Sequence, residues 1–442
     1  MTVAPNQPCA DETLETGRGL RERLRSTLPP PGPIRILQTN TLISAIGYGL
    51  YTSGSALFFV KAADLSQSQV GLGFSLAGIV GAFISVRIGR LADRWGPRET
   101  ALCFAVLLSL LMVAAVFVRD LWEFLPVIVC IGVAETAGNV AWGALIGHLV
   151  PKEDRVRLMA RNRVLVNIGF SVGVLFAGVA IGLNTRLAYA CLVLGMAVAA
   201  MLTAVLSLRL PRVPPSTAHG GSKRSGGISY DVPYIALSAV SSMTLIGNTI
   251  LTVGLPLWVV TQTSLPIQLA AWMILGNTAI VILLQVKVSK GSDTVPGARR
   301  MQRRAFIVLA AACACAPLVH DLGPVPGAVV LLIVVALLTM GELWGESANW
   351  SFRFNFLDPR AQGAYSGMYI LGNSIPTVTA PALVTFVTAR FVPGGWFILA
   401  GVFMVGLLLN GPVIAWAERT RAASGTTAAE LENQGVEALQ EA

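Results

Sequence analysis

Charge is scarce in this sequence. Only 12% of its 442 residues are Asp, Glu, Lys or Arg, whereas an ordinary soluble domain has roughly 25%. A water-soluble fold of this length needs more polar surface than these residues supply, so the composition excludes soluble enzymes, nucleic-acid binders and disordered proteins. Hydrophobic residues make up 54% of the chain, and the mean hydropathy is +0.68. We therefore expect most of the chain to lie in lipid.

Residues that hold metals, disulfides or nucleotides are also few. The chain has three His and six Cys. The His residues are scattered and predict no metal cluster. Five of the Cys lie in apolar runs, where a thiol packs as a small apolar group. No phosphate-binding glycine loop occurs, which argues against an ATP-driven protein. We therefore expect no metal and no cofactor.

Long apolar runs fill the chain between two polar ends. Each run can cross about 30 Å of hydrocarbon at 1.5 Å per residue as a helix, and none shows the alternation of a membrane β-barrel. The sequence therefore predicts an all-α polytopic membrane protein with twelve transmembrane helices. The expected spans are residues 35–61, 68–90, 99–118, 121–149, 162–184, 187–208, 233–261, 266–288, 304–320, 325–355, 363–389 and 395–417.

The distribution of basic residues predicts the orientation. An even number of spans puts both termini on one side of the membrane. If that side is the cytoplasm, the inward segments hold 28 of the 32 Lys and Arg residues. Cytoplasmic loops collect Lys and Arg, so we expect a multi-pass protein of the cell (inner or plasma) membrane with both termini cytoplasmic.

A loop rich in Pro, Ser and Gly divides the spans six and six. Residues Glu135 to Trp142 and Glu342 to Asn349 repeat at a constant offset, with Glu, Gly and Ala identical, which favours two pseudo-symmetric six-helix bundles. The predicted segments are a cytoplasmic N-terminal tail (1–34), an N-terminal bundle (35–209), a cytoplasmic linker (210–232), a C-terminal bundle (233–418) and a cytoplasmic C-terminal tail (419–442).

The loop after the second span carries a known motif. It resembles the signature loop of the major facilitator superfamily, G-x-x-x-D-R-x-G-x-R, at Gly89, Asp93, Arg94, Gly96 and Arg98. A merely basic loop would not explain the acid or the two glycines. The resemblance covers about residues 35–418 and implies a secondary transporter, working as a monomer, with no enzymatic activity. It also implies that these five residues form a gating loop, in which Asp93 latches the two halves near residues 362–364.

The fifth span resembles the glycine-rich motif of facilitator-type antiporters, with Val174 in place of its Pro and Ala177 in place of one Gly. We expect Gly169, Gly173 and Gly178 to let helices approach closely. Generic small-residue packing explains the pattern equally well, so it supports export only weakly.

Three acids lie deep in predicted spans, where ionisable residues are costly and usually functional. They are Glu135, Glu342 and Glu346. Glu342 and Glu346 share a helix face, and two close carboxylates in low dielectric cannot both ionise easily. These acids are our candidates for proton coupling or cation recognition. The alternative is that Arg353 or polar neighbours satisfy them and they have no role in transport.

The family resemblance implies that spans 1, 4, 7 and 10 line a central cavity. Each polar or aromatic residue on these spans is a candidate for substrate contact or, alternatively, for helix packing. The candidates are Asn40, Tyr48, Tyr51, Asn139, Trp142, Asn248, Thr252, Trp258 and Asn349. Proton-driven exporters of this superfamily carry an Arg in span 4, but the matching position here is near Ile128, so their mechanism cannot be copied residue by residue.

The sequence therefore predicts a transporter that exports a small drug-like or metabolite molecule against protons or another coupling ion. An importer or a passive facilitator of the same fold remains an alternative. A polytopic membrane enzyme or sensor would need a catalytic cluster or a sizeable soluble domain, and the sequence shows neither. The expected partners are the small-molecule substrate, the coupling ion and the lipid bilayer, without nucleic acid.

Overall fold

The computed structural model describes residues 32–63, 65–215, 230–263, 265–266, 268–319 and 322–423, and this part of the chain is helical without strands. Most of the predicted tails and linker lie outside the described residues. The long helices are α2 (Pro33–Ala62), α3 (Gln67–Trp95), α4 (Pro97–Ala115), α5 (Leu121–Leu149), α6 (Lys152–Leu183), α7 (Arg186–Ser207), α11 (Gln268–Val288), α12 (Val295–Cys315), α13 (Pro324–Asn355), α14 (Gln362–Arg390) and α15 (Gly395–Ala423).

The remaining span is a broken helix. It consists of α8 (Val232–Ser242), the 3-10 turn η2 (Met243–Leu245), α9 (Ile246–Thr249), the π-helical segment η3 (Ile250–Gly254) and α10 (Leu255–Gln262). Irregular segments of this kind often occur at functional sites within helices. A further 3-10 turn, η4 (Ala316–Val319), extends α12.

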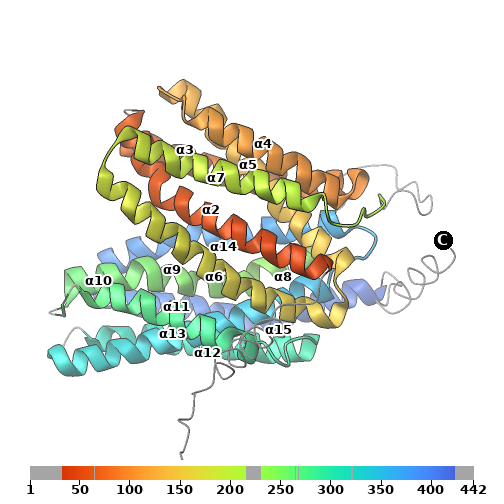
Figure 1. The fold of residues 1–442 in the computed structure, drawn as a ribbon. Helices are drawn as coiled ribbons and strands as arrows, with labels where there is room; N and C mark the ends of the chain where they lie inside the picture. The colour runs from red at the N-terminus through yellow and green to blue at the C-terminus, as the bar shows by residue number, and fades with distance from the viewer. Residues whose placement is uncertain are drawn as a thin grey trace, which may run out of the picture.

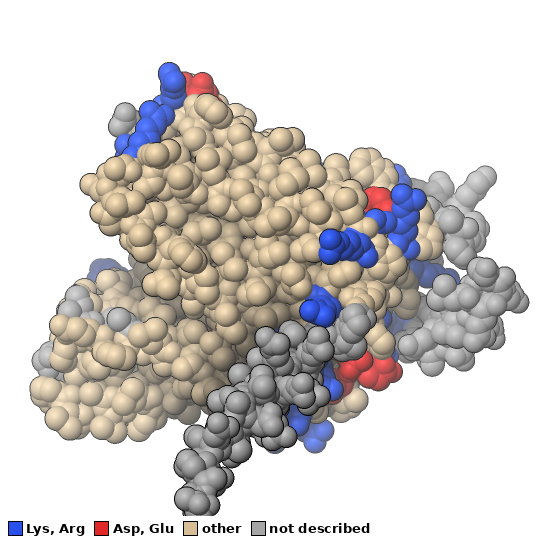
Figure 2. Space-filling model, viewed as in Figure 1, with Lys and Arg blue, Asp and Glu red and all other residues tan. Residues whose placement is uncertain are grey.

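Length and composition fit a membrane protein. Among the described residues, eleven helical segments are long and apolar enough to span a bilayer, and α11 contributes a shorter apolar stretch, Trp272–Val288. On the face in Figure 2, Lys and Arg lie at the ends of the molecule, with a belt almost free of them between. The predicted all-α polytopic fold is confirmed.

Two helix starts differ from the prediction by nine or ten residues. Helix α6 begins at Lys152, ten residues before the expected start, and α12 begins at Val295 rather than at residue 304. The sequence stretches before the expected starts are basic and look like loops. They are helical because a helix can continue past the hydrocarbon, and Thr294 caps α12 by accepting a hydrogen bond from the backbone of Gly297.

Helices α2–α7 and α8–α15 form two groups that lie side by side (Figure 1). Helix α2 begins and α15 ends at the same end of the molecule. That end also holds Asp93, which bonds the start of α14, and we call it the Asp93 end. The opposite end is the far end.

The buried cores show that the two groups meet mainly at the Asp93 end. There, Leu37 of α2 shares a cluster with Phe354 of α13, and Val86 of α3 shares one with Phe352. Toward the far end each group keeps its own core, built around Phe124 in one group and around Trp258 in the other. Figure 2 shows the surface hollowed between the groups at the far end. The described chain is therefore closed at the Asp93 end and open at the other.

Candidate functional site

A buried ion pair joins the two helix groups. Arg163 on α6 donates a hydrogen bond to Oε1 of Glu342 on α13, and its other terminal nitrogen lies 3.8 Å from Glu346 Oε1. The Glu342 side chain is 3% exposed. Two carboxylates thus share one guanidinium across the boundary between the groups. Burying charges in this way is costly unless they are paired and hydrogen-bonded.

Two amides complete the bonding of Glu342. Asn248, on α9 of the broken helix, donates to Oε1 at 3.2 Å, and Asn277 on α11 donates to Oε2 at 3.0 Å. Asn277 also lies 3.1 Å from the Thr339 hydroxyl, one turn away on α13. The Glu342 carboxylate is therefore held by three donors from three different helices.

Arg163 is a residue of this site that the sequence prediction did not single out. It stands at the start of the expected span 162–184, beside a basic segment, whereas α6 begins at Lys152 and carries Arg163 more than two turns into the helix. The alternative partner for the acid pair, Arg353, is wrong, because Arg353 stacks on the ring of Tyr369 at 4.5 Å. The sequence held one signal for Arg163: two acids predicted inside the membrane require a cation nearby to balance their charge.

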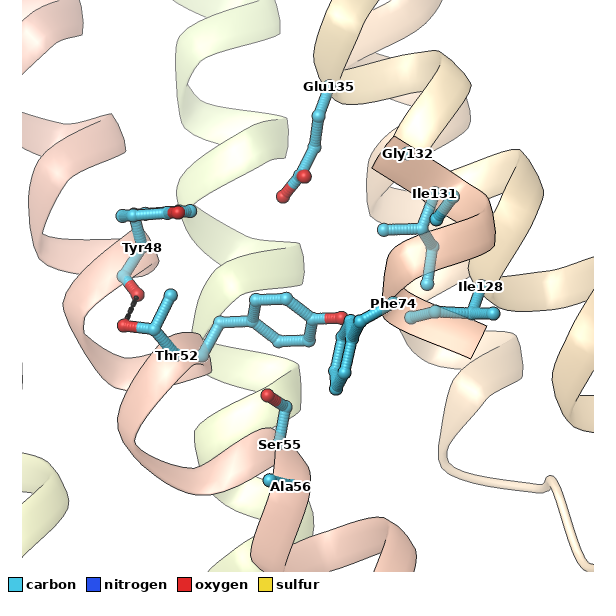
Figure 3. Close-up of a pocket in the computed structure, with 11 residues that line it drawn as sticks. Tyr48, Thr52, Ser55, Ala56, Phe74, Ile128, Ile131, Gly132 and Glu135 are labelled. Carbon is cyan, nitrogen blue, oxygen red and sulfur yellow. Dashed lines mark hydrogen bonds between the residues drawn. The ribbon is translucent and has the colours of Figure 1, made fainter. Parts of the chain in front are cut away.

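Glu135 lies in a cavity of about 270 Å³ formed by α2, α3 and α5. Its carboxylate points into the space across from Tyr48, with Phe74 and Ile128 further along the wall (Figure 3). Glu135 Oε1 is buried and has no hydrogen-bond partner among the described residues, and the same is true of the Tyr51 hydroxyl. The structure thus places Tyr48, Tyr51 and Glu135 around one cavity.

The predicted gating loop is mostly helical, since Gly89, Asp93 and Arg94 lie in the last turns of α3, and it bonds the start of α14. Asp93 accepts hydrogen bonds from the backbone of Gly363 at 2.7 Å and of Ala364 at 2.9 Å. The first turn of a helix has free N–H groups and a positive dipole end, which suit a carboxylate. We call this contact the Asp93 latch. It joins the two groups at the position that the family resemblance implied.

Close helix approach supports the latch. A Cβ on Gly89 would overlap the Gly363 backbone, so only glycine allows α3 and α14 to come this near. Ser85 adds a hydrogen bond of 2.8 Å to the Gly367 carbonyl.

The other motif residues act within their own group. Gly96 has a φ of +99° at the turn between α3 and α4, a conformation that favours glycine. Arg98 donates to the Ser207 and Leu208 carbonyls at the end of α7, where a cation stabilises the helix. Arg94 is exposed.

Three of the predicted cavity residues make packing contacts within their own helix group in this structure. Asn40 donates to Ser207 at 3.3 Å within its group. Asn349 bonds the hydroxyls at the end of α8. Trp258 is 1% exposed and packs edge-to-face on Trp396. Helix position alone does not distinguish a polar packing contact from a cavity contact.

The remaining cavity candidates are less enclosed. Tyr48, Asn139 and Thr252 are exposed, and Trp142 is half-buried against a cluster at the Asp93 end. Asn248 is the candidate on the broken helix that the structure brings to Glu342.

The predicted packing glycines divide into two kinds. Cβ atoms on Gly169 and Gly173 would meet the α2 backbone, at Leu42 and at Gly49 respectively. Gly178 is exposed, and a Cβ there would meet nothing within 4 Å. Gly178 therefore does not pack a helix in this structure, because it lies on a different face of α6 from Gly173. Helices α2 and α6 remain together at that level, since the neighbouring Ala177 is fully buried and Lys61 of α2 donates a hydrogen bond to Asn184 just after α6.

Comparisons with known proteins agree with this architecture. The family model described as Major Facilitator Superfamily matches residues 39–381. A protein of Bacillus subtilis (strain 168), "Putative metabolite transport protein YfiG", is 27% identical over 142 residues, which are 30% of this chain. The chain matches only 30% of that relative's length.

Several solved structures share the fold. FucP in the outward conformation has a TM-score of 0.67 at 15% identity, covering 86% of this chain and 98% of FucP. A bacterial homologue of the iron transporter ferroportin, in an outward-facing state, has a TM-score of 0.66 at 13% identity, covering 87% and 99%. The proton:xylose symporter XylE has a TM-score of 0.63 at 15% identity, covering 85% and 94%. At these identities the likeness shows the fold alone.

Proposed function

Because this chain belongs to the major facilitator superfamily, we propose that it is a proton-coupled secondary transporter that exports a small drug-like or metabolite molecule. The two helix groups alternate between opening at the Asp93 end and opening at the far end. The Asp93 end faces the cytoplasm of the cell membrane, with both termini there, and the far end faces outward.

The observation that carries the proposal is the sharing of Arg163 by Glu342 and Glu346. One positive charge cannot balance two carboxylates, so a single proton can join the cluster and bring its net charge to zero. The cluster also spans the two groups, since Arg163 is on α6 and both acids are on α13. A proton that joins the acid pair weakens its attraction for Arg163 and so loosens the contact between the groups. Proton binding and alternating access are thereby linked at one site.

Two comparisons support a small-molecule substrate and a proton. One structural neighbour is a proton:xylose symporter, and the B. subtilis relative is named for metabolite transport. The glycine face of α6, where Gly169 and Gly173 contact α2, fits the antiporter motif but is explained equally well by small-residue packing, so it supports export only weakly.

The test begins with an accumulation screen of diverse compounds in cells with and without the protein. A compound that the protein depletes from cells is then measured in proteoliposomes under an imposed pH gradient. Export predicts accumulation that a protonophore abolishes. Equilibration that persists with the protonophore identifies a passive facilitator, and accumulation in cells identifies an importer.

The coupling residues are tested with Glu342→Gln/Glu346→Gln. The double variant should lose pH-driven accumulation but keep exchange of labelled for unlabelled substrate. The matched control is Glu99→Gln, which removes an acid that is 40% exposed and pairs only loosely with the exposed Arg212. Unchanged coupling in the double variant would remove both acids from the proposed role.

A further inference from the structure

Glu135 is the deep acid that lacks a basic partner. The ion pairs of the described residues join Arg163 to Glu342 and Glu346, and Arg212 to Glu99. Glu135 takes part in none of them, and its Oε1 is buried without a hydrogen bond. A carboxylate in this situation needs a proton or an external cation to balance it. Within the described ranges no residue supplies such a cation, so we infer that the balance comes from solution.

The walls around Glu135 suit the body of an organic cation. Tyr48 and Tyr51 of α2 and Phe74 of α3 bring aromatic rings to the cavity, and Ile128 lines it from α5. Aromatic rings attract cations through their negative faces and also bury apolar groups. Tyr51 is 4% exposed, and its hydroxyl has no partner in the described structure. The cavity therefore offers one acid, one free hydroxyl and a largely apolar surface.

We propose that the Glu135 cavity binds a small organic monocation, an ammonium group carrying an apolar or aromatic body. This inference rests on the proposed transport function and names the class of its substrate. The ammonium lies at the Glu135 carboxylate, and the body lies against the tyrosines and Phe74. At about 270 Å³ the cavity is slightly below the range of roughly 300–1,000 Å³ typical for drug-sized ligands, so the cation is small.

An inorganic cation fits the cavity less well. Metal ions bind to several converging oxygen or nitrogen ligands, and the described residues contain no group of three His, Cys, Asp or Glu that could hold one. The Glu342 cluster is a poor site for an organic cation, because Arg163, Asn248 and Asn277 already donate to the Glu342 carboxylate and leave no room beside it. The Glu342 cluster therefore holds Arg163, and the Glu135 cavity holds the organic cation.

Binding at Glu135 exchanges one positive charge for another. The protonated carboxyl loses its proton to water as the ammonium arrives, and the ionised carboxylate pairs with the ammonium. The charge in the cavity is unchanged by the exchange. The groups facing Glu135 that could also titrate are Tyr48 and Tyr51, and both remain neutral. A cation and a proton thus compete for one carboxylate.

The binding test uses the purified full-length protein in lipid nanodiscs and isothermal titration calorimetry. Phenethylammonium is the probe, and phenethyl alcohol is its neutral counterpart. The cation should bind about tenfold or more tightly than the alcohol, and Glu135→Gln should weaken cation binding about tenfold or more. Glu123→Gln, which removes an exposed acid from the start of the same helix, should bind as the wild type does. Equal binding of the two probes, equal binding to Glu135→Gln, or no binding of the cation at millimolar concentration overturns the proposal.

A second measurement needs no variant. Phenyltrimethylammonium has a permanent charge and no proton to give, so protons released when it binds in weak buffer come from the protein. Release of up to one proton per bound cation is expected, and no release overturns the competition at Glu135.

The two proposals fail separately. If Glu342→Gln/Glu346→Gln keeps proton coupling while Glu135→Gln loses cation binding, the coupling role falls and the cation site stands. If flux is proton-coupled but Glu135→Gln binds the cation normally, only the cation site falls.

Discussion

Neutralising Asp93 should shift the protein away from the conformation described here. Asp93→Asn keeps the size of the side chain but leaves one acceptor oxygen for the two N–H groups of Gly363 and Ala364. The new side-chain NH2 group then faces one of these N–H groups, donor against donor. A hydrogen bond to a charged group contributes about 1.5–3 kcal/mol, and the helix dipole adds roughly 0.3–1 kcal/mol. We therefore expect the closed Asp93 end to lose about 2–3 kcal/mol relative to the opposite conformation.

That loss corresponds to a change of about 30- to 150-fold in the conformational ratio. A wild-type ratio near 99:1 would become roughly even. The assay is a distance distribution between spin labels at Arg119 and Arg390, which are exposed at the far end of the two groups, in a cysteine-free background. The wild type should give one long distance, and Asp93→Asn should add a shorter one.

Glu99→Gln is the matched control, because Glu99 lies near the same loop but bonds no residue of the other group. Its distance distribution should equal that of the wild type. A folded Asp93→Asn variant with an unchanged distribution would refute the energetic role of the Asp93 latch.

Three further predictions concern the stability of the folded protein and the coupling of transport. Arg163→Met should destabilise the protein by about 3–5 kcal/mol. The double variant Arg163→Met/Glu342→Gln should lose less stability than the sum of the two single variants, measured as a double-mutant cycle of thermal unfolding in detergent. Additive losses would contradict the ion pair. Gly173→Ala should lower the thermal midpoint through a clash worth about 1–3 kcal/mol with the α2 backbone, while Gly178→Ala leaves it unchanged; equal effects would contradict the packing. Asn277→Ala should cost about 1–3 kcal/mol and reduce proton-driven flux, because Glu342 loses one of its three donors; wild-type flux would show that Glu342 needs no such orientation.

The sequence predicted the helical architecture well because each span is long, apolar and bounded by charge or turn residues. Composition cannot give contacts between distant helices. Arg163 stands next to other basic residues at the start of an expected span, and its contact with Glu342, 179 residues away, cannot be predicted from that position. The early start of α6 was missed for the same reason.

The candidate site was predicted in part. The acids were found because charge is rare in these spans, and Asp93 was found through its motif. The free Oε1 of Glu135 and the burial of Asn349 depend on the exact rotation of each helix. Hydrophobic periodicity gives little rotation signal in a helix that is apolar on every side. The break at η3 has a signal in the sequence that the prediction did not use: Pro256 follows it and has no N–H to bond the Thr252 carbonyl.

The close contact of Gly173 with Gly49 joins α6 to α2 backbone against backbone. No side chains lie between the two backbones at this contact, so we expect the two helices to move together. Helix α6 carries Arg163, and helix α2 carries the tyrosines of the Glu135 cavity. We therefore expect a change of charge at the acid pair to alter the position of the cavity wall, and by reciprocity we expect whatever fills the cavity to alter the contact between Arg163 and Glu342.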